Sequence, residues 1–134
     1  MVTSASTTAH VSCFGLSDGA VTSTTSGGTS PYSYKWNTAV TTYYELGVPA
    51  GTYTMTATDA KGCTSAATTT VTEPALLVAN AAMATQVSCF GLSDGSVSAT
   101  PTGGTTSYSY LWNTGATTAT VTGLAAGTYS VTVT

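Results

Sequence analysis

The sequence predicts an all-β protein built from two tandem antiparallel β-sandwich units. Short runs of alternating apolar and polar residues recur, with turn residues about every 8–12 positions, which is typical of a β-sandwich. No segment has a convincing helical period. Residues 11–19 also return unchanged as residues 87–95, an offset of 76 positions. That offset is too long for a solenoid turn and suits a small domain strung in tandem.

The repeat divides the chain into a first sandwich, residues 1–74, and a second, residues 75–134. Residues 11–58 align with residues 87–134 without a gap at about 60% identity, which predicts one fold for both units. The second unit stops at the match of Thr58, so it is incomplete and its closing strand is missing. We therefore expect the natural polypeptide to continue. The open sheet edge should make the second unit less ordered, or another chain should cover it.

The strongest strand signal covers residues 32–37. Period-two alternation places Tyr32, Tyr34 and Trp36 on one face of this strand. The second unit keeps the same aromatic residues, the last of which is Trp112. Because these are the largest side chains of a thin core and recur at strand spacing, we expect Trp36 and Trp112 to lie in the core.

Weaker alternating patterns predict the other strands of the first unit, which turns containing Gly, Pro or Asp separate. In order, they cover residues 1–12, 20–26, 41–46, 52–58 and 63–72. Within residues 52–58, alternation places Tyr53, Met55 and Ala57 on one face and the threonines on the other. Tyr53, like Tyr129 of the second unit, follows Ala-Gly-Thr and is expected in the core, with its hydroxyl bonded back to the preceding turn. A Trp on the third main strand together with this Tyr suits an immunoglobulin-like arrangement.

The loop at residues 13–19 belongs to the motif that is identical in the two units. Asp18 can accept a hydrogen bond from the backbone ahead of it, and Gly19 can adopt a positive φ, so both suit a turn. We expect Phe14, and Phe90 in the second unit, to close the end of the sandwich.

The composition favours a secreted or surface protein that neither binds nucleic acid nor inserts into a membrane. Charged residues make up 5% of the chain, against about 25% in ordinary soluble proteins, and the net charge is −3. Basic residues for phosphate contacts are scarce, and no run approaches the ~18 apolar residues of a membrane span. Abundant Thr, Ser and Gly with little Lys fit an extracellular location, and we expect any export signal to lie outside this sequence.

The three cysteines become interpretable through the repeat. Cys13 matches Cys89, whereas the match of Cys63 falls just past the last residue. We predict a disulfide between Cys13 and Cys63, which would close a loop of about 50 residues and contribute about 4 kcal/mol in the chain-entropy model. The alternative is two buried free thiols. Cys89 should lack its partner, and the wide spacing with a single His disfavours zinc.

No set of residues supports catalysis, so we expect neither an enzyme nor a cofactor. The single histidine, His10, is replaced by Gln86 in the second unit. The few carboxylates lie mostly in turns, where a structural role is favoured. Calcium held by Asp18, Asp59 and Glu73 at a unit end is an alternative, although hard cations want more oxygen ligands than this chain offers.

The two units differ most at residues 39–46. The first unit has Tyr43 and Tyr44 where the second has Ala119 and Thr120. Neighbouring residues on a strand point to opposite faces, so at least one of the two rings should face solvent. We take this pair as the candidate ligand contact, with a glycan of a surface polysaccharide as the expected ligand class.

The ordered set of motifs resembles the SprB-type repeat. These motifs are Val-Ser-Cys-Phe-Gly-Leu-Ser-Asp-Gly, Gly-Gly-Thr-Ser-Pro-Tyr-Ser-Tyr-Lys-Trp-Asn-Thr, the stretch from Ala-Gly-Thr-Tyr to Asp-Ala-Lys-Gly-Cys, and Val-Thr-Glu-Pro. The resemblance covers nearly the whole chain and implies an immunoglobulin-like or PKD-like sandwich per repeat. It further implies a very large cell-surface adhesin that the type IX secretion system exports and that serves gliding motility and attachment. The family pattern has cysteines at positions 13, 63 and 89 and no catalytic residues.

Two functional hypotheses follow. In the first, the units are stiff spacers in a long extracellular filament, whose partners are neighbouring repeats of the same chain, with lateral self-association as a further expectation. In the second, the first unit is a glycan-binding module that uses Tyr43 and Tyr44. The departure of the first unit from the family pattern at residues 39–46 separates the two hypotheses, because only the second assigns a role to that loop.

Overall fold

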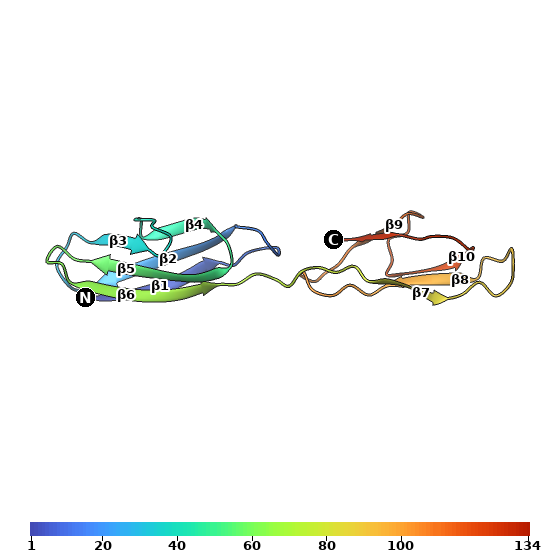
Figure 1. Ribbon diagram of the computed structural model, residues 1–134, viewed down its shortest axis with the longest axis horizontal. Coiled ribbons are helices and arrows are strands. Elements are labelled where there is room, and N and C mark those ends of the chain that lie inside the picture. Colours follow the sequence, from blue (N-terminus) through green and yellow to red (C-terminus); the bar gives the residue numbers. More distant parts are fainter. The chain divides into compact units, whose positions relative to one another are not determined.

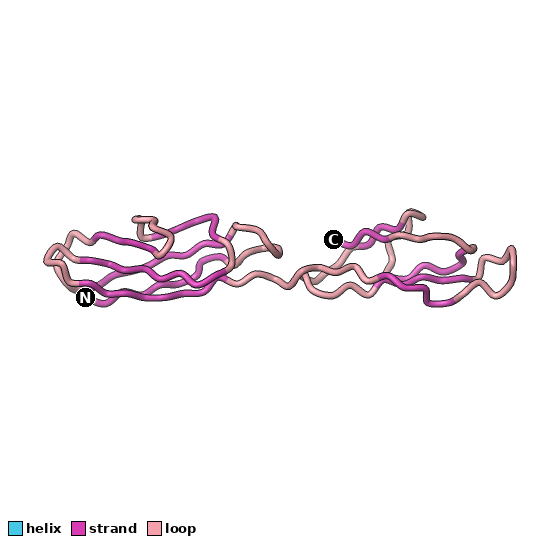
Figure 2. The backbone as a smooth tube through the Cα atoms, in the orientation of Figure 1, coloured by secondary structure: helices cyan, strands magenta, loops and turns pink.

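The chain forms two compact units, Met1–Pro74 (unit 1) and Ala75–Thr134 (unit 2), in a computed structural model that describes residues 1–134 (Figure 1). Each unit consists of strands joined by turns and loops (Figure 2). Every strand pair is antiparallel, which confirms the predicted all-β class. The structure contains no helix with the length and apolar character that a membrane span requires.

Unit 1 is a sandwich of two three-stranded sheets. Its strands are β1 (Val2–Ala9), β2 (Gly19–Ser26), β3 (Ser33–Trp36), β4 (Tyr44–Val48), β5 (Gly51–Thr58) and β6 (Thr64–Val71). One sheet has the order β1-β2-β4 and the other has the order β3-β5-β6. The hairpins β1-β2 and β5-β6 each stay within one sheet, whereas the other three connections pass between the sheets. This crossing pattern packs the two layers face to face (Figure 1).

The core of unit 1 lies between its two sheets. Trp36 on β3 is 1% exposed, and Val21 on β2 and Met55 on β5 are 0% exposed. Along β5, alternation buries Tyr53, Met55 and Ala57 and leaves the intervening threonines partly exposed, as the sequence pattern predicted. The large side chains thus come from both layers.

Tyr53 ties β5 to the turn that precedes it. Its hydroxyl donates a hydrogen bond to the carbonyl oxygen of Pro49 at 2.7 Å. In unit 2 the hydroxyl of Tyr129 donates to the carbonyl oxygen of Ala125 at 2.8 Å. Burial raises the pKa of Tyr53, and the negative charge of Glu45 raises that pKa further. The hydroxyl therefore stays protonated and able to donate at neutral pH.

Strands β1 and β6 run side by side in the same direction and close one side of the sandwich. Hydrogen bonds join these strands and the residues that follow them, among them Thr3 N–H to Ser65 Oγ (3.2 Å), Thr7 Oγ1 to Thr70 O (2.9 Å) and Val11 N–H to Thr72 O (3.0 Å). His10 accepts a further bond through Nδ1 from the N–H of Thr72, at 3.0 Å. The sequence did not predict this capping role for His10. The chain therefore enters unit 1 at one end and leaves it at the other.

Unit 2 repeats this arrangement without a sixth strand. Its strands are β7 (Ala81–Thr85), β8 (Gly95–Ala99), β9 (Tyr110–Trp112), β10 (Thr120–Leu124) and β11 (Val131–Val133). The sheets have the orders β10-β8-β7 and β11-β9, and Trp112 is 2% exposed at their centre. Strand β11 matches the second half of β5, but it pairs only with β9. No strand of residues 75–134 takes the place that β6 has in unit 1.

The aromatic residues of the repeated loop do not close the end of the sandwich. Phe14 is 53% exposed and Phe90 is fully exposed, so the prediction of a buried plug is wrong. Val11, at the start of the loop, covers the end of the core instead and is 3% exposed. Because β1 ends at Ala9, the loop turns away from the core soon after Val11 and carries Phe14 into solvent.

Gly19 is required for a different reason from the predicted one. Its φ lies outside the left-handed region, which Gly15 of the same loop adopts instead, with a φ of +76°. A Cβ on Gly19 would lie 2.7 Å from Val71 Cγ1 and 2.8 Å from the carbonyl oxygen of Val48. Glycine is therefore needed here because β2 approaches its neighbours closely, a tertiary constraint that the local sequence does not reveal.

Candidate functional site

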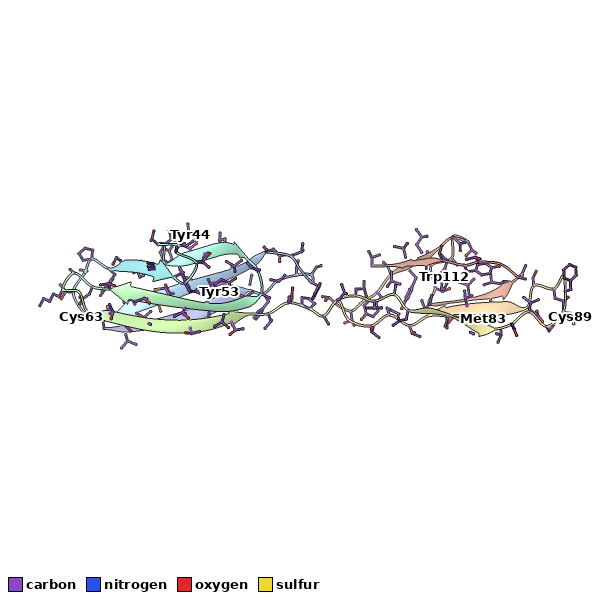
Figure 3. All side chains as sticks on the ribbon, viewed as in Figure 1. Tyr44, Tyr53, Cys63, Met83, Cys89 and Trp112 are labelled. Atoms are coloured by element: carbon purple, nitrogen blue, oxygen red, sulfur yellow. The ribbon has the colours of Figure 1, made fainter.

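Two adjacent tyrosines form an exposed aromatic pair in unit 1. Tyr43 is 54% exposed and Tyr44 is 42% exposed, and their ring centroids are 4.9 Å apart with an interplanar angle of 72°. Tyr44 begins β4, an edge strand of the sheet β1-β2-β4, and lies on the outside of the unit (Figure 3). Leu46, two residues further along the same strand, is 68% exposed. The strand thus presents aromatic and aliphatic surface to solvent.

The backbone of the tyrosine pair is held firmly while the rings remain accessible. The N–H and the hydroxyl of Ser23 both donate hydrogen bonds to the carbonyl oxygen of Tyr43, each at 2.8 Å. Ser23 itself is only 5% exposed, so these bonds are anchored in the sheet. A fixed backbone lowers the entropy that the segment would lose on binding a ligand. Unit 2 has Ala119 and Thr120 at these positions and offers no such pair.

Cys13 and Cys63 lie at opposite ends of unit 1, so the predicted disulfide between them is wrong. Near Cys13, the N–H of Gly15 donates to Glu73 Oε2 at 2.7 Å, which places this loop where the chain leaves unit 1. Cys63 lies in the turn before β6, where its N–H donates to Asp59 Oδ1 at 2.9 Å (Figure 3). The length of β6, on the order of 25 Å, separates the two ends, whereas bridged Cα atoms lie within about 7 Å.

We expect all three thiols of the monomeric chain to react with an alkylating agent without prior reduction, because all three cysteines are exposed and unpaired. Intact-mass measurement after treatment with iodoacetamide should give three adducts on the folded monomer. A reduced and unfolded sample provides the control for complete labelling. A monomer with one adduct and a peptide linking residues 13 and 63 would contradict the fold described for unit 1.

Asp59 organises the end of unit 1 at which the chain enters. Its Oδ1 accepts hydrogen bonds from the N–H groups of Lys61 and Cys63, both at 2.9 Å, and its Oδ2 accepts one from the N–H of Thr29 at 3.0 Å. These donors favour the charged carboxylate and lower the pKa of Asp59, the N–H of Thr29 most and that of Cys63 next. The residue therefore joins the β5-β6 turn to the loop before β3.

Asp18 and Asp94 perform matching tasks in the repeated loops. Each accepts bonds from the serine six residues earlier, through its hydroxyl and through its N–H at 3.0 Å: Ser12 for Asp18 and Ser88 for Asp94. The serine hydroxyls lower the two pKa values most, and the serine N–H groups lower them further. The predicted structural role thus takes another form, because each carboxylate bonds back across its loop and not to the backbone ahead.

The carboxylates named for calcium do not gather. Glu73 and Asp18 belong to the end at which the chain leaves unit 1, whereas Asp59 lies at the end where the chain enters. Among residues 1–134, no three His, Cys, Asp or Glu side chains come close enough to hold a metal ion. The proposed clustering is therefore wrong, because the length of the strands separates residues that the sequence alone could not place.

The stability of both units should fall in acid. Lowered pKa values of Asp18, Asp59 and Asp94 mean that their charged forms stabilise the fold above the ordinary aspartate pKa of 3.8, and that this stabilisation is lost as the pH falls through the lowered values. Denaturant unfolding between pH 7 and pH 2 should therefore show a decline that begins near pH 4. Asp59→Asn should flatten this decline for unit 1 only, and Asp94→Asn for unit 2 only. An unchanged profile in both variants would contradict this origin.

Comparison with known families accounts for the repeated motif. No curated protein matches the chain. The SprB repeat family matches residues 5–41 and again residues 81–117, which together make up more than half of the chain. The two matched segments are offset by 76 positions, the same offset as the identical loops, and each extends from the opening strand to just past the core tryptophan. The chain therefore belongs to the SprB repeat family, a family of structural repeats whose name points to gliding adhesins at the cell surface.

Proposed function

We propose that the chain is a force-transmitting spacer of a secreted cell-surface adhesin that serves attachment and gliding motility. Membership in the SprB repeat family supports the surface and adhesin part of this proposal. The spacer role rests on one observation in unit 1, the parallel path of its first and last strands. Export by the type IX route, neighbouring repeats as partners and lateral association into filaments are parts of the same proposal.

The path of the chain suits unit 1 to carry tension. A pull applied where the chain enters β1 and leaves β6 draws these two adjacent strands in opposite directions. The hydrogen bonds of Thr3, Thr7 and Val11 lie across this direction, so they are loaded in shear and must break together. Bonds that break together resist force better than bonds that open one after another. A spacer between a cell and a surface needs this resistance.

Single-molecule pulling on the full chain, held at Met1 and Thr134, tests the spacer role. Unit 1 should unfold in one step that releases on the order of 20 nm of chain. Thr7→Val should lower the unfolding force of this step, because it removes the hydrogen bond that the Thr7 hydroxyl donates to Thr70 O and the one that it accepts from the Thr69 hydroxyl. Each such bond contributes about 0.5–1.5 kcal/mol.

Thr8→Val provides the matched control, because Thr8 is the exposed neighbour of Thr7 on β1. It carries the same change of side chain away from β6 and should leave the unfolding force unchanged. Gradual lengthening of unit 1 at low force would contradict the proposed role. Equal effects of Thr7→Val and Thr8→Val would remove the β1–β6 contact as its physical basis.

A second candidate function is glycan binding by unit 1. It is favoured by the exposed edge-to-face pair of Tyr43 and Tyr44, next to the exposed Leu46. Aromatic faces pack against the apolar C–H faces of sugar rings, and phenolic hydroxyls supply hydrogen bonds at the rim. The restriction of the pair to unit 1 would make any recognition specific to one repeat.

Titration of bacterial surface polysaccharides against the full chain tests this second function. Binding should be lost in the double variant Tyr43→Ala, Tyr44→Ala and retained in Phe14→Ala, which removes another exposed ring of unit 1. If Phe14→Ala weakened binding as much as the double variant, the tyrosine pair would not be the site. Absence of binding to any polysaccharide would leave the spacer role alone.

A further inference from the structure

Unit 2 carries an open groove between its two sheets. The groove has a volume of about 540 Å³, and its walls come from β7, β8, β9, β10 and the turn that leads to β11. Its lining includes Met83, Gly95, Trp112, Leu124 and Tyr129. Met83 and Trp112 come from the two different layers of the unit (Figure 3).

In unit 1 the matching residues lie beneath or beside β6. They are, in the same order, Thr7, Gly19, Trp36, Val48 and Tyr53. Thr7 Oγ1 lies 2.9 Å from Thr69 Oγ1 of β6, and Val71 of β6 sits directly over Gly19. The groove of unit 2 is thus the space that a strand fills in unit 1.

The residues around this groove are less covered than their counterparts. Val11 and Tyr53 are 3% and 4% exposed in unit 1, whereas the matching Val87 and Tyr129 are half-buried. Met83, on the edge strand β7, is 63% exposed. Apolar surface around a groove of this kind favours an apolar or amphipathic occupant, because covering it removes that surface from water.

We propose that this groove binds a β-strand of the β6 type, added antiparallel to β11. Strand β11 has one partner, β9, so its other edge has unpaired backbone N–H and C=O groups that an added strand would satisfy. The occupant is a closing strand with the residue pattern that β6 has in unit 1. The groove would accept such a strand whether or not the chain acts as a spacer.

The repeat fixes the register of the added strand. In unit 1, β6 pairs along the whole of β5, with Ala67 opposite Met55 and Val71 opposite Gly51. Transferred by 76 positions, this register places the residue equivalent to Ala67 opposite Val131. Alternate residues of β6 face inward, are small, and end in Val71, which is 1% exposed. The occupant must therefore present small inward residues and then one branched apolar residue.

One position of the groove differs from unit 1 and determines which residue the bound strand should carry at the Thr69 position. Met83 replaces Thr7, so the hydroxyl that bonds to Thr69 in unit 1 is absent. An apolar residue at the Thr69 position would instead cover the exposed Met83 side chain. The groove should therefore bind a strand with Thr69→Val at least as tightly as the parent strand.

Titration of a labelled peptide with the sequence of Thr64–Glu73 into the full chain tests the proposal. Hydrogen exchange should show new protection of Val131–Val133 and none in unit 1. Val71→Asp in the peptide should weaken binding at least about tenfold, because it places a charge where an apolar side chain is buried. Thr70→Asp is the matched control, since Thr70 faces outward, and should change binding by less than about threefold.

Attaching the strand covalently to the chain tests the same proposal even where a short free peptide binds too weakly to detect. Fusing the sequence of Asp59–Glu73 directly after Thr134 continues the repeat in register and raises the effective concentration of the strand to about the millimolar range. The thermal midpoint of unit 2 should rise, and Val71→Asp in the fused segment should abolish the rise.

The same measurements can overturn the proposal. Absence of protection with the peptide and of stabilisation in the fusion would show that the groove does not bind a β6-type strand. Equal effects of the Val71→Asp and Thr70→Asp versions would show that the bound strand does not adopt the register that β6 has on β5. A concentration-dependent dimer of the full chain that protects Val131–Val133 without peptide would assign the groove to a second copy instead.

Discussion

Replacement of Trp36 by alanine should lower the free energy of unfolding of unit 1 by about 3–5 kcal/mol and leave unit 2 unchanged. Trp36 is 1% exposed and stands at the centre of the core cluster of unit 1. Its indole N–H also donates to the carbonyl oxygen of Thr42 at 3.0 Å, so the variant loses a hydrogen bond together with its core packing. A unit of this size is stable by only about 4–11 kcal/mol, so the loss is a large share.

The two tryptophans make this result measurable unit by unit, because the chain has two Trp residues, one in each unit. In Trp36→Ala, the fluorescence of Trp112 reports on unit 2 alone, while hydrogen exchange along β5 reports on unit 1. Tyr43→Ala is the control, since it removes an exposed ring and should change stability by no more than about 0.5 kcal/mol. A loss of unit 2 in Trp36→Ala, or similar effects of the two variants, would contradict the independent cores.

Replacement of Gly19 by alanine should destabilise unit 1 by about 1–3 kcal/mol. The added Cβ would meet Val71 Cγ1 and the carbonyl oxygen of Val48 at less than 3 Å, and the backbone carbonyl has no freedom to move aside. The expected cost comes from overpacking between β2, β4 and β6, since the φ of Gly19 suits any residue. In the pulling experiment the variant should also weaken unit 1, because Val71 belongs to the terminal strand.

Gly51→Ala is the matched control for Gly19→Ala. Gly51 also lies on a strand, and its φ is likewise outside the left-handed region. A Cβ added to Gly51 would lie 3.8 Å from its nearest neighbour, Tyr53 Cε2, which is an ordinary van der Waals contact. Denaturant unfolding followed by Trp36 fluorescence in a Trp112→Phe background compares the two variants. Equal stability of Gly19→Ala and Gly51→Ala would show that the close approach at Gly19 is not a constraint.

The elements of the fold were largely predictable because their signals are local. Alternation at residues 52–58 placed Tyr53, Met55 and Ala57 on one face, and the structure buries all three. The strand predicted at residues 1–12 is shorter, Val2–Ala9, because a regular ladder ends where the loop turns away at His10. Strand ends depend on which neighbour is available to pair, and a single segment of sequence does not contain that information.

The candidate site was predictable only where it rests on a difference between the repeats. Tyr43 and Tyr44 stood out because the second unit lacks them, and both rings prove to be exposed. The disulfide prediction failed because the spacing of Cys13 and Cys63 along the chain says nothing about which ends of the strands they occupy. The contacts of Thr7 and His10 with the segment around β6 were not predictable either. Their partners, Thr70 and Thr72, lie about 60 residues further along the chain, and local sequence patterns do not show which distant segments pack together.

By itself, the sequence determined that the chain is a tandem repeat of all-β units, which residues of each strand face inward, and to which family the chain belongs. Patterns that can be read directly from the sequence determine these properties. The period of two along each strand shows which residues face inward, and the recurrence of the nine-residue motif shows the tandem repeat. Only the tertiary structure decided that β1 and β6 lie side by side, that the cysteines are held apart, and that a groove opens in unit 2. Each of these depends on contacts between strands far apart in the chain, where packing and backbone pairing, not local propensity, select the neighbour.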